Sequence, residues 1–473
     1  MEQNIEFLKT STGINGLDEI TNGGFPRGRP ILICGSAGCG KTLFGIQFLV
    51  NGITGQNEPG VFISFEETSK DLAQNVLSLG FDLEKLKSEN LLRIDHIRIE
   101  RSEIEETGDY DLEGLFIRLN YAIDAIGAKR VVLDTIESLF SGMTNQALLR
   151  SEIRRLFQWL KDKGVTTVIT GERGQSSLTR QGLEEYVSDC VILLDFRVID
   201  QIATRRLRII KYRGSTHGTN EYPFLIDEHG ISVIPITSLK LEYKTSREII
   251  STGLPGLDAL FKKGGYYEGS STLITGTAGT AKTILAGYFA LGSCLRNERV
   301  LLFSFEESPD QLLRNMLTIG IDLEPFIEAG LLLIHATRPT LQGLELHLLV
   351  LHKLLIEFNP RAVIIDPISS LVSVGSPIEV KAMLVRLMDT LKIRKINALF
   401  TSLMHHNSDI REDSTIDAVS SLADNWLYVK NDLAAAKRRR SLLIVKSRGM
   451  EHFNDFIDFT ISANGIKMQT TET

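Results

Sequence analysis

The sequence predicts an α/β protein with two homologous domains, each a mostly parallel sheet with helices on both faces. Three observations lead to this fold class. The chain repeats itself over most of its length, each copy alternates apolar runs of strand length with amphipathic segments, and each copy places a glycine-rich loop between a strand and a helix. Alternating strands and helices are typical of a parallel sheet that is covered on both sides.

The repeat is long, and its blocks return in the same order, which excludes a short-period solenoid. STGINGLDEI, for example, returns as STGLPGLDAL. The matching blocks are 11–20 with 251–260, 62–84 with 302–324, 130–140 with 361–372, and 211–217 with 446–452. A polar stretch at 238–252 separates the copies, so we expect one domain at 1–245 and a second at 246–473.

The composition limits the class of protein. The 473 residues are 43% hydrophobic, carry a formal net charge of −7 and include four cysteines without a C-x-x-C pair. No apolar run approaches the roughly 18 residues of a membrane helix, and the first residues do not resemble a secretion signal. We therefore expect a cytoplasmic protein without membrane contact, and the acidic balance argues against a nucleic-acid partner.

The secondary structure of each copy follows from its apolar pattern. PILICG and STLITG have the length and apolarity of strands, and each ends at a glycine-rich loop. The apolar segments that follow these loops should be helices, as should two amphipathic segments later in each copy. The expected strands are 30–35 and 271–276, and the expected helices are 43–53, 284–296, 149–164 and 380–395.

The first loop, GSAGCGKT, matches the phosphate-binding pattern G-x-x-x-x-G-K-[ST], with a strand before it and a helix after it. In this motif backbone N–H groups surround the nucleotide phosphates. Lys41 should reach the β- and γ-phosphates of ATP, and Thr42 should bind Mg²⁺. The predicted nucleotide-binding residues are Gly35, Ser36, Ala37, Gly38, Cys39, Gly40, Lys41 and Thr42.

The second loop, GTAGTAKT, has Ala281 where the pattern has its second glycine. Alanine keeps the backbone N–H, and a left-handed backbone there would cost roughly 1–2 kcal/mol. That is about a tenfold to thirtyfold loss of affinity, so we expect this loop to bind nucleotide as well. Its predicted binding residues are Gly276, Thr277, Ala278, Gly279, Thr280, Ala281, Lys282 and Thr283, the last also a Mg²⁺ ligand.

Acidic residues follow the strands next to each loop. Glu66–Glu67 and Glu306–Glu307 each follow an apolar run, where a carboxylate could orient the oxygen that attacks the γ-phosphate. A helix N-terminus also favours acids, but the same pair occurs in both copies. Asp134 ends RVVLD and Asp366 ends AVIID, the Walker B pattern of a Mg²⁺-holding aspartate.

Two basic segments, RRLRIIKYR at 205–213 and KRRRSLLIVKSR at 437–448, alternate charged and apolar residues as strands do. They raise the alternative of a DNA-dependent ATPase. Neither contains the interleaved aromatic residues of a base-stacking surface. A second alternative is a scaffold that binds ATP without turning it over, which the repeated glutamate pairs disfavour.

Over about residues 10–465 the chain resembles the KaiC family of circadian clock ATPases and autokinases. The resemblance rests on the two phosphate loops, the FEE segments, the Walker B strands and the K-x-R-G-x-x-H blocks. It implies RecA-like domains, a double-ring homohexamer, catalytic roles for the four glutamates, Mg²⁺ contact by Glu306 and nucleotide contact by Ser78. It also implies that further residues reach the nucleotide of the neighbouring subunit: Lys211, Arg213, His217, Asp227, Lys446, Arg448 and His452.

The same resemblance implies autophosphorylation in the second domain. Ser420 and Ser421, ahead of Asp424, match the adjacent hydroxyl pair that this family phosphorylates, although two serines together are also common in turns. The first copy has Val187–Ser188 instead, as in a domain that only hydrolyses ATP. We therefore expect slow ATP hydrolysis in the first domain and serine phosphorylation in the second.

Some features depart from the family pattern. The chain ends soon after FTISANGIKMQTTET, without the long tail that binds the stimulating partner KaiA, so we do not expect KaiA as a partner. A KaiB-like partner on the first ring stays open. Leu79 and Ile319 stand where the clock protein has aromatic residues near the adenine. Together with Ala281, these departures favour a member outside the KaiA-driven clock.

Overall fold

The computed structural model describes residues 7–97, 112–140, 146–174, 178–179, 188–199, 202–235, 246–404, 419–434 and 437–469. The chain divides into two compact units, Met1–Ser238 and Leu239–Thr473. The predicted boundary between residues 245 and 246 adjoins residues 236–245, which lie outside the described residues, so that boundary stays a prediction. None of the helices described is both long and apolar enough to cross a membrane.

Within the described residues each unit forms a nine-stranded sheet, and the strand that leads into the phosphate loop lies in its middle. The order in the first unit is β11-β10-β9-β8-β3-β7-β6-β4-β5, and in the second β16-β15-β17-β18-β14-β19-β20-β21-β22. In both sheets six strands run parallel, from the edge strand β5 to β8 in the first and from the edge strand β16 to β19 in the second, and the last three strands pair antiparallel. This confirms the predicted fold class of two tandem, mostly parallel α/β domains.

The strands of the first sheet are β3 (Pro30–Gly35), β4 (Gly60–Ser64), β5 (Leu92–His96), β6 (Arg130–Asp134), β7 (Thr166–Glu172), β8 (Cys190–Ile199), β9 (Ile202–Tyr212), β10 (Glu221–Asp227) and β11 (Gly230–Val233). The helices of this unit are α1 (Leu17–Ile20), α2 (Lys41–Gln56), α3 (Ser69–Leu77), α4 (Leu83–Ser88), α6 (Glu113–Ile126), α7 (Ile136–Leu139) and α8 (Gln146–Asp162). A short pair, β1 (Lys9–Thr10) and β2 (Phe25–Pro26), lies outside the large sheet.

The second sheet consists of β14 (Ser271–Gly276), β15 (Val300–Ser304), β16 (Leu332–Ala336), β17 (Ala362–Asp366), β18 (Asn397–Leu403), β19 (Asn425–Ala434), β20 (Lys437–Ser447), β21 (Ile457–Ser462) and β22 (Gly465–Met468). The helices are α10 (Pro255–Asp258), α11 (Lys282–Leu295), α12 (Pro309–Leu317), α13 (Glu324–Glu328), α14 (Leu344–Glu357) and α15 (Pro377–Ile393), with 3₁₀ turns η1 (Pro339–Leu341) and η2 (Ile368–Ser373). The short pair of this unit is β12 (Ile249–Ile250) with β13 (Tyr266–Tyr267).

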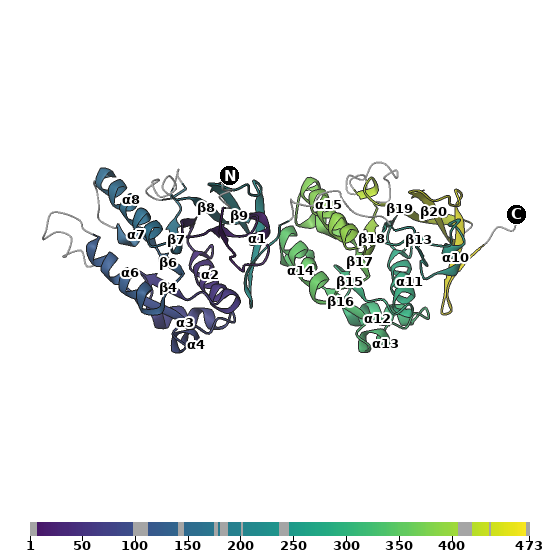
Figure 1. The fold of residues 1–473 in the computed structure, drawn as a ribbon. Coiled ribbons are helices and arrows are strands. Elements are labelled where there is room, and N and C mark those ends of the chain that lie inside the picture. The colour runs from purple at the N-terminus through teal and green to yellow at the C-terminus, as the bar shows by residue number, and fades with distance from the viewer. Residues whose placement is uncertain are drawn as a thin grey trace, which may run out of the picture. The chain divides into compact units, whose positions relative to one another are not determined.

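Helices cover both faces of each sheet, as Figure 1 shows for α2 against α6 and α8, and for α11 against α14 and α15. In the first unit Phe44 and Phe48 of α2 are buried in one apolar cluster, and Leu119 and Phe157 of α6 and α8 in another. Strands covered on both faces read as continuous apolar runs, which explains why PILICG and STLITG could be recognised.

All four predicted helices begin two or three residues earlier in the structure than the apolar pattern predicted. The helix expected from residue 380 begins at Pro377, because Ser376 and Glu379 form a capping box that the apolar pattern does not reveal. The helices after the two loops begin at the loop lysines, Lys41 and Lys282. A charged residue does not belong to the apolar pattern, so this pattern could not place the helix starts there.

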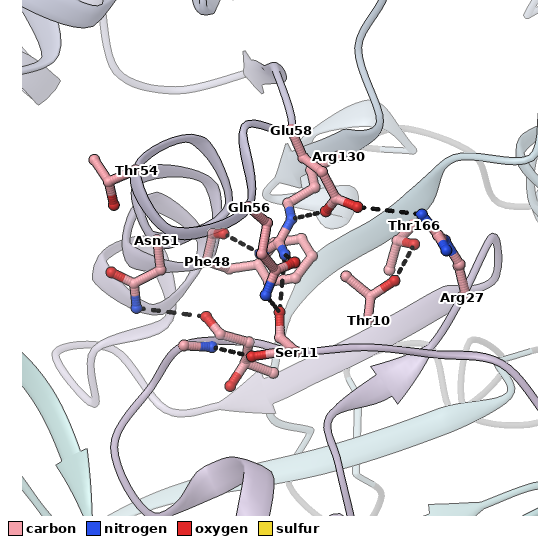
Figure 2. Close-up of polar contacts among 12 residues, drawn as sticks. Thr10, Ser11, Arg27, Phe48, Asn51, Thr54, Gln56, Glu58, Arg130 and Thr166 are labelled. Carbon is pink, nitrogen blue, oxygen red and sulfur yellow. Dashed lines mark hydrogen bonds and ion pairs between the residues drawn. The ribbon is translucent and has the colours of Figure 1, made fainter.

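A buried arginine holds α2, the helix that follows the first phosphate loop. The side chain of Arg130, at the start of β6, is fully buried and donates to Glu58 at 2.7 Å and to the carbonyls of Phe48 and Ser11 at 2.8 Å each. Figure 2 shows these contacts converging on the guanidinium from α2 and from the segment after β1. A Cβ at Gly52 would lie 2.2 Å from Arg130 Nε, so α2 can approach only through glycine.

Candidate functional site

The first phosphate loop lies at the carboxyl end of β3, between that strand and α2. The ammonium group of Lys41 donates to the carbonyls of Gly35 and Ser36, each at 3.0 Å, and so lies over the loop. Gly38 is left-handed, and no atom lies within 4 Å of the position a Cβ would take there. The space beside Gly38 is therefore open, which is compatible with a bound phosphate.

Asp134 ends β6 beside the loop, as the Walker B pattern predicts. It accepts a hydrogen bond of 2.9 Å from Thr42 Oγ1 and another from Thr170 of β7. Burial raises the pKa of the Asp134 carboxyl, while the hydroxyls of Thr170 and Thr42 lower it. A buried carboxylate next to a threonine hydroxyl is a donor set that suits Mg²⁺, which prefers hard oxygen ligands.

The second unit repeats this arrangement. Lys282 donates to the carbonyls of Gly276 and Thr277 at 2.9 and 2.8 Å. Asp366 ends β17 and accepts a hydrogen bond from Thr401 of β18. Burial raises the pKa of the Asp366 carboxyl, while hydrogen bonds from Thr401 and Thr283 lower it. Burial lowers the pKa of Lys282, and the charges of Asp366 and Glu306 oppose that shift.

Ala281 has the left-handed backbone of the glycine that it replaces. Its φ and ψ are 85° and 22°, against 105° and 19° for Gly40. This left-handed conformation costs an alanine roughly 1–2 kcal/mol of strain, as expected from the sequence. The Ala281 side chain is buried in the apolar core of the unit, and this burial offsets part of the strain.

We expect the second loop to bind nucleotide despite Ala281. In a Lys41→Ala background, which weakens the first site, titration calorimetry should detect binding of a non-hydrolysable Mg-ATP analogue. Adding Ala281→Gly should tighten this binding by at most about thirtyfold, since the strain is roughly 1–2 kcal/mol. The Lys41→Ala/Lys282→Ala double variant is the control, and equal binding signals from it and from Lys41→Ala alone would contradict the prediction.

The four predicted glutamates lie at the carboxyl edge of their sheets, where one phenylalanine, Phe65 or Phe305, separates each pair from the end of β4 or β15. Glu66 accepts hydrogen bonds from Ser138 at 2.6 Å and from Thr135 at 3.0 Å, and Glu306 accepts one from Ser370 at 2.9 Å. The second glutamate of each pair forms a hydrogen bond with an asparagine instead. Asn75 donates to Glu67 at 3.0 Å, and Asn315 donates to Glu307 at 3.4 Å.

The glutamates of each pair therefore differ in their surroundings. Glu66 and Glu306 are close enough to the Walker B aspartates Asp134 and Asp366 for their charges to raise the pKa of these carboxyls. Glu67 and Glu307 are each oriented by an asparagine of the following helix, α3 or α12.

Sequence reasoning did not single out the partners that hold these carboxylates. They are Thr170, Thr401, Ser138, Ser370, Asn75 and Asn315. The repeat carried a signal for the asparagines, because Asn75 and Asn315 occupy the same place in the matching blocks 62–84 and 302–324.

Ser78, which the family resemblance assigned to the nucleotide, is exposed directly after α3. The hydrogen bonds between described residues do not connect it to the phosphate loop, and its role stays a prediction.

Both basic segments form strands, β9 and β20, as the alternation of charge predicted. Arg213 follows β9 and forms an ion pair with Asp189 at 3.4 Å, and Arg448 follows β20 and pairs with Asp424 at 3.5 Å. Lys161 and Lys392 form further ion pairs with Asp189 and Asp424, at 2.7 and 3.1 Å.

The other residues assigned to the neighbouring nucleotide lie nearby in the sequence. Asp227 ends β10. A ring nitrogen of His217 lies 2.9 Å from the carbonyl of Gly218, and one of His452 lies 3.2 Å from the carbonyl of Phe453.

The structure brings the two predicted acceptor serines together with two of the predicted cations. Lys446 donates to the carbonyl of Ser420, and Arg448 donates to the carbonyl of Ser421. Ser420 is half-buried and Ser421 is exposed. The backbone that carries both hydroxyls is therefore held by positively charged side chains.

These serines lie at the opposite edge of the sheet from their own phosphate loop. They precede β19, whose Asn425 pairs in parallel with Thr272 at the start of β14, and Asp424 N donates to the Ser271 carbonyl at 2.9 Å. The loop begins at Gly276, where β14 ends. At about 3.3 Å per residue, the strand separates the two edges by roughly 17 Å.

The fold and these loops define a class, a P-loop ATPase with two tandem RecA-like domains. A family model described as "ATPase: KaiC" matches residues 10–238 and 250–473. The chain is 54% identical to "Circadian clock protein KaiC2" of Synechocystis sp. over 466 residues, which is 98% of this chain and 82% of the relative. It is 36% identical to "Circadian clock oscillator protein KaiC" of Synechococcus elongatus over 460 residues, 97% and 88% of the two chains. The chain therefore belongs to the KaiC family of ATPases.

Proposed function

We propose that the first domain of this chain hydrolyses ATP, and that the second transfers the γ-phosphate of ATP to Ser420 or Ser421. The observation that supports this most is the contact of Lys446 and Arg448 with the backbone carbonyls of these two serines. Arginine and lysine are preferred phosphate-binding side chains. A phosphate arriving at either serine would lie among cations that already border the segment.

In the second domain, Lys282 would bind the β- and γ-phosphates of ATP, and Thr283, Asp366 and Glu306 would hold Mg²⁺. Bound Mg²⁺ would neutralise the negative charge that develops on the phosphates. Glu307, oriented by Asn315, would accept the proton of the attacking serine hydroxyl. In the first domain Lys41, Thr42 and Asp134 would serve as their counterparts, and Glu66 and Glu67 would orient a water molecule.

The acceptor serines would receive their phosphate from a neighbouring subunit. Their own loop lies at the far edge of β14, and in-line transfer needs reacting atoms about 3–3.5 Å apart. In a ring, the amino-terminal edge of the second sheet, which carries the serines, could instead lie against the phosphate loop of the neighbouring subunit. The serines would then be close to that subunit's ATP. We propose a double-ring homohexamer, in which Lys211, Arg213, His217 and Asp227, with Lys446, Arg448 and His452, reach the nucleotide of the neighbouring subunit.

Phosphorylation at such an interface would act as a switch. A phosphoserine adds about −1.5 to −2 charges, next to Lys446, Arg448 and Asp424. The names of the relatives describe circadian clock proteins, and we extend to this chain a timing or signalling role that could include a KaiB-like partner on the first ring.

Mass spectrometry of phosphopeptides tests this proposal. Purified protein incubated with Mg-ATP should carry phosphate on Ser420 or Ser421, and Ser420→Ala/Ser421→Ala should carry none in this segment while still hydrolysing ATP. Unmodified serines in the wild type would overturn the autokinase proposal. ATP hydrolysis stimulated by single-stranded DNA, with a DNA-binding constant that falls steeply with salt, would instead favour a DNA-dependent ATPase.

A further inference from the structure

The second unit contains a cavity of about 580 Å³ at the amino-terminal edge of its sheet. Its walls come from the segment before β12, the turn after β13, the end of α15 and the residues after β20. Pockets for small molecules commonly measure about 300–1,000 Å³. The cavity is separate from the phosphate loop, which lies at the other end of β14.

Basic side chains dominate the lining of this cavity. Lys392 and Arg448 share the carboxylate of Asp424. The other three basic residues, Arg247, Lys263 and Lys395, form no ion pair with a described residue, while Glu268 adds one more carboxylate to the wall. Lys263 donates to the Tyr267 hydroxyl at 2.8 Å, and that hydroxyl donates to the Gly449 carbonyl at 3.1 Å. The ammonium group is thus held in place by a neutral partner.

The first unit fills the corresponding position with an apolar ring. Phe7 lies four residues before Ser11, as Arg247 lies four residues before Ser251 in the matching block. The Phe7 ring lies 6.3 Å from Tyr212 between ring centroids, with the Arg29 guanidinium over it. A Cβ at Gly214 would lie 2.6 Å from this ring, whereas a Cβ at Gly449 would meet only Tyr267, at 4.0 Å. Arginine in place of phenylalanine therefore replaces a packed ring with a charge beside an open cavity.

We propose that this cavity binds a small phosphorylated molecule at a site distinct from the two phosphate loops of its own chain and from the neighbouring nucleotide to which the ring proposal assigns Arg448. Arg247 and Lys395 would contact the phosphate as charged donors, because an arginine fork and a lysine ammonium suit phosphate oxygens. Lys263 and Tyr267 would form the adjoining wall. The proposal does not depend on the autokinase proposal, because binding can be measured without serine phosphorylation.

Pyridoxal 5′-phosphate is a suitable probe, since it combines a phosphate with an aldehyde. Its aldehyde carbon forms an imine with a lysine amine and releases water, and borohydride supplies the hydride that reduces the imine to a stable secondary amine. The full chain is labelled with both loops saturated by Mg-ADP, and adducts are mapped by mass spectrometry. Labelling of Lys263 or Lys395 should be at least about tenfold faster than that of exposed Lys381 on α15, because a bound phosphate raises the local concentration of the aldehyde.

Inorganic pyrophosphate should suppress this excess labelling. Arg247→Phe, which restores the residue of the first unit, should abolish it, while Arg247→Lys, which keeps the charge, should retain most of it. Circular dichroism and Mg-ATP binding would show that both variants fold. The proposal is overturned if Lys263 and Lys395 react no faster than Lys381, if pyrophosphate does not compete, or if Arg247→Phe labels like the wild type.

Discussion

Replacing Lys282 with alanine is expected to lower phosphate incorporation on Ser420 and Ser421 by at least about 10²-fold, the usual cost of removing one donor to the developing charge. Lys282 lies over the second loop through its contacts with Gly276 and Thr277. The charges of Asp366 and Glu306 act on its ammonium group, which therefore belongs to the same electrostatic cluster. Its loss would remove the positive charge that faces the γ-phosphate.

The matched control for this prediction is Lys41→Ala, which makes the equivalent change in the first loop. It should lower ATP hydrolysis by the first domain while ring assembly and serine labelling persist at saturating ATP. Phosphopeptide quantification against an isotope-labelled standard gives both values. Equal labelling of Lys282→Ala and wild type would place the phosphate donor outside the second loop.

Replacing Arg130 with methionine should destabilise the first unit by about 3–5 kcal/mol, the cost typical of removing one partner of a buried ion pair. Methionine would fill part of the volume but donate nothing. Glu58 would lose the partner 2.7 Å away, and the carbonyls of Phe48 and Ser11 would lose their donors (Figure 2). The effect should appear as a lower denaturant midpoint for the first unit alone.

The two tryptophans of the chain, Trp159 and Trp426, lie in different units. In a Trp426→Phe background, fluorescence of Trp159 reports unfolding of the first unit. Arg296→Met in the second unit is the matched control, followed through the fluorescence of Trp426 in a Trp159→Phe background. Arg296 contacts the Ser251 carbonyl at 3.3 Å and Glu298 at 2.9 Å while its side chain is 29% exposed. It should cost about 1 kcal/mol, the typical contribution of a hydrogen bond, and an equal or smaller cost for Arg130→Met would contradict the prediction.

The sequence allowed the sheet cores and the phosphate loops to be predicted, because both are local patterns. Strands buried on both faces are continuous apolar runs, and PILICG and STLITG agree with β3 and β14 residue for residue. The loop motif fixes its own context, so Lys41 and Lys282 lie over loop carbonyls as expected. Helix starts were less certain, since caps such as Ser376 lie outside the apolar pattern.

The rest of the site depends on contacts between distant segments. Thr170 reaches Asp134 only because β7 lies next to β6 in parallel register, and no local pattern gives that order. Likewise, β14 lies between β18 and β19, which puts Ser420 and Ser421 at the edge opposite their own loop. The resemblance assigned Lys446 to a neighbouring nucleotide but did not anticipate its contact with the Ser420 carbonyl within the same chain.

A subunit-mixing experiment tests most directly whether the second domain phosphorylates its neighbour. Lys282→Ala subunits keep acceptor serines, and Ser420→Ala/Ser421→Ala subunits keep an intact loop. Under this proposal, neither variant incorporates phosphate at these positions when it is assembled alone. After mixing and reassembly with Mg-ATP, phosphate should appear on Ser420 or Ser421 of the Lys282→Ala subunits, identified by an isotope label. Absence of phosphate in verified mixed rings, with wild-type rings labelled in parallel, would contradict transfer between subunits.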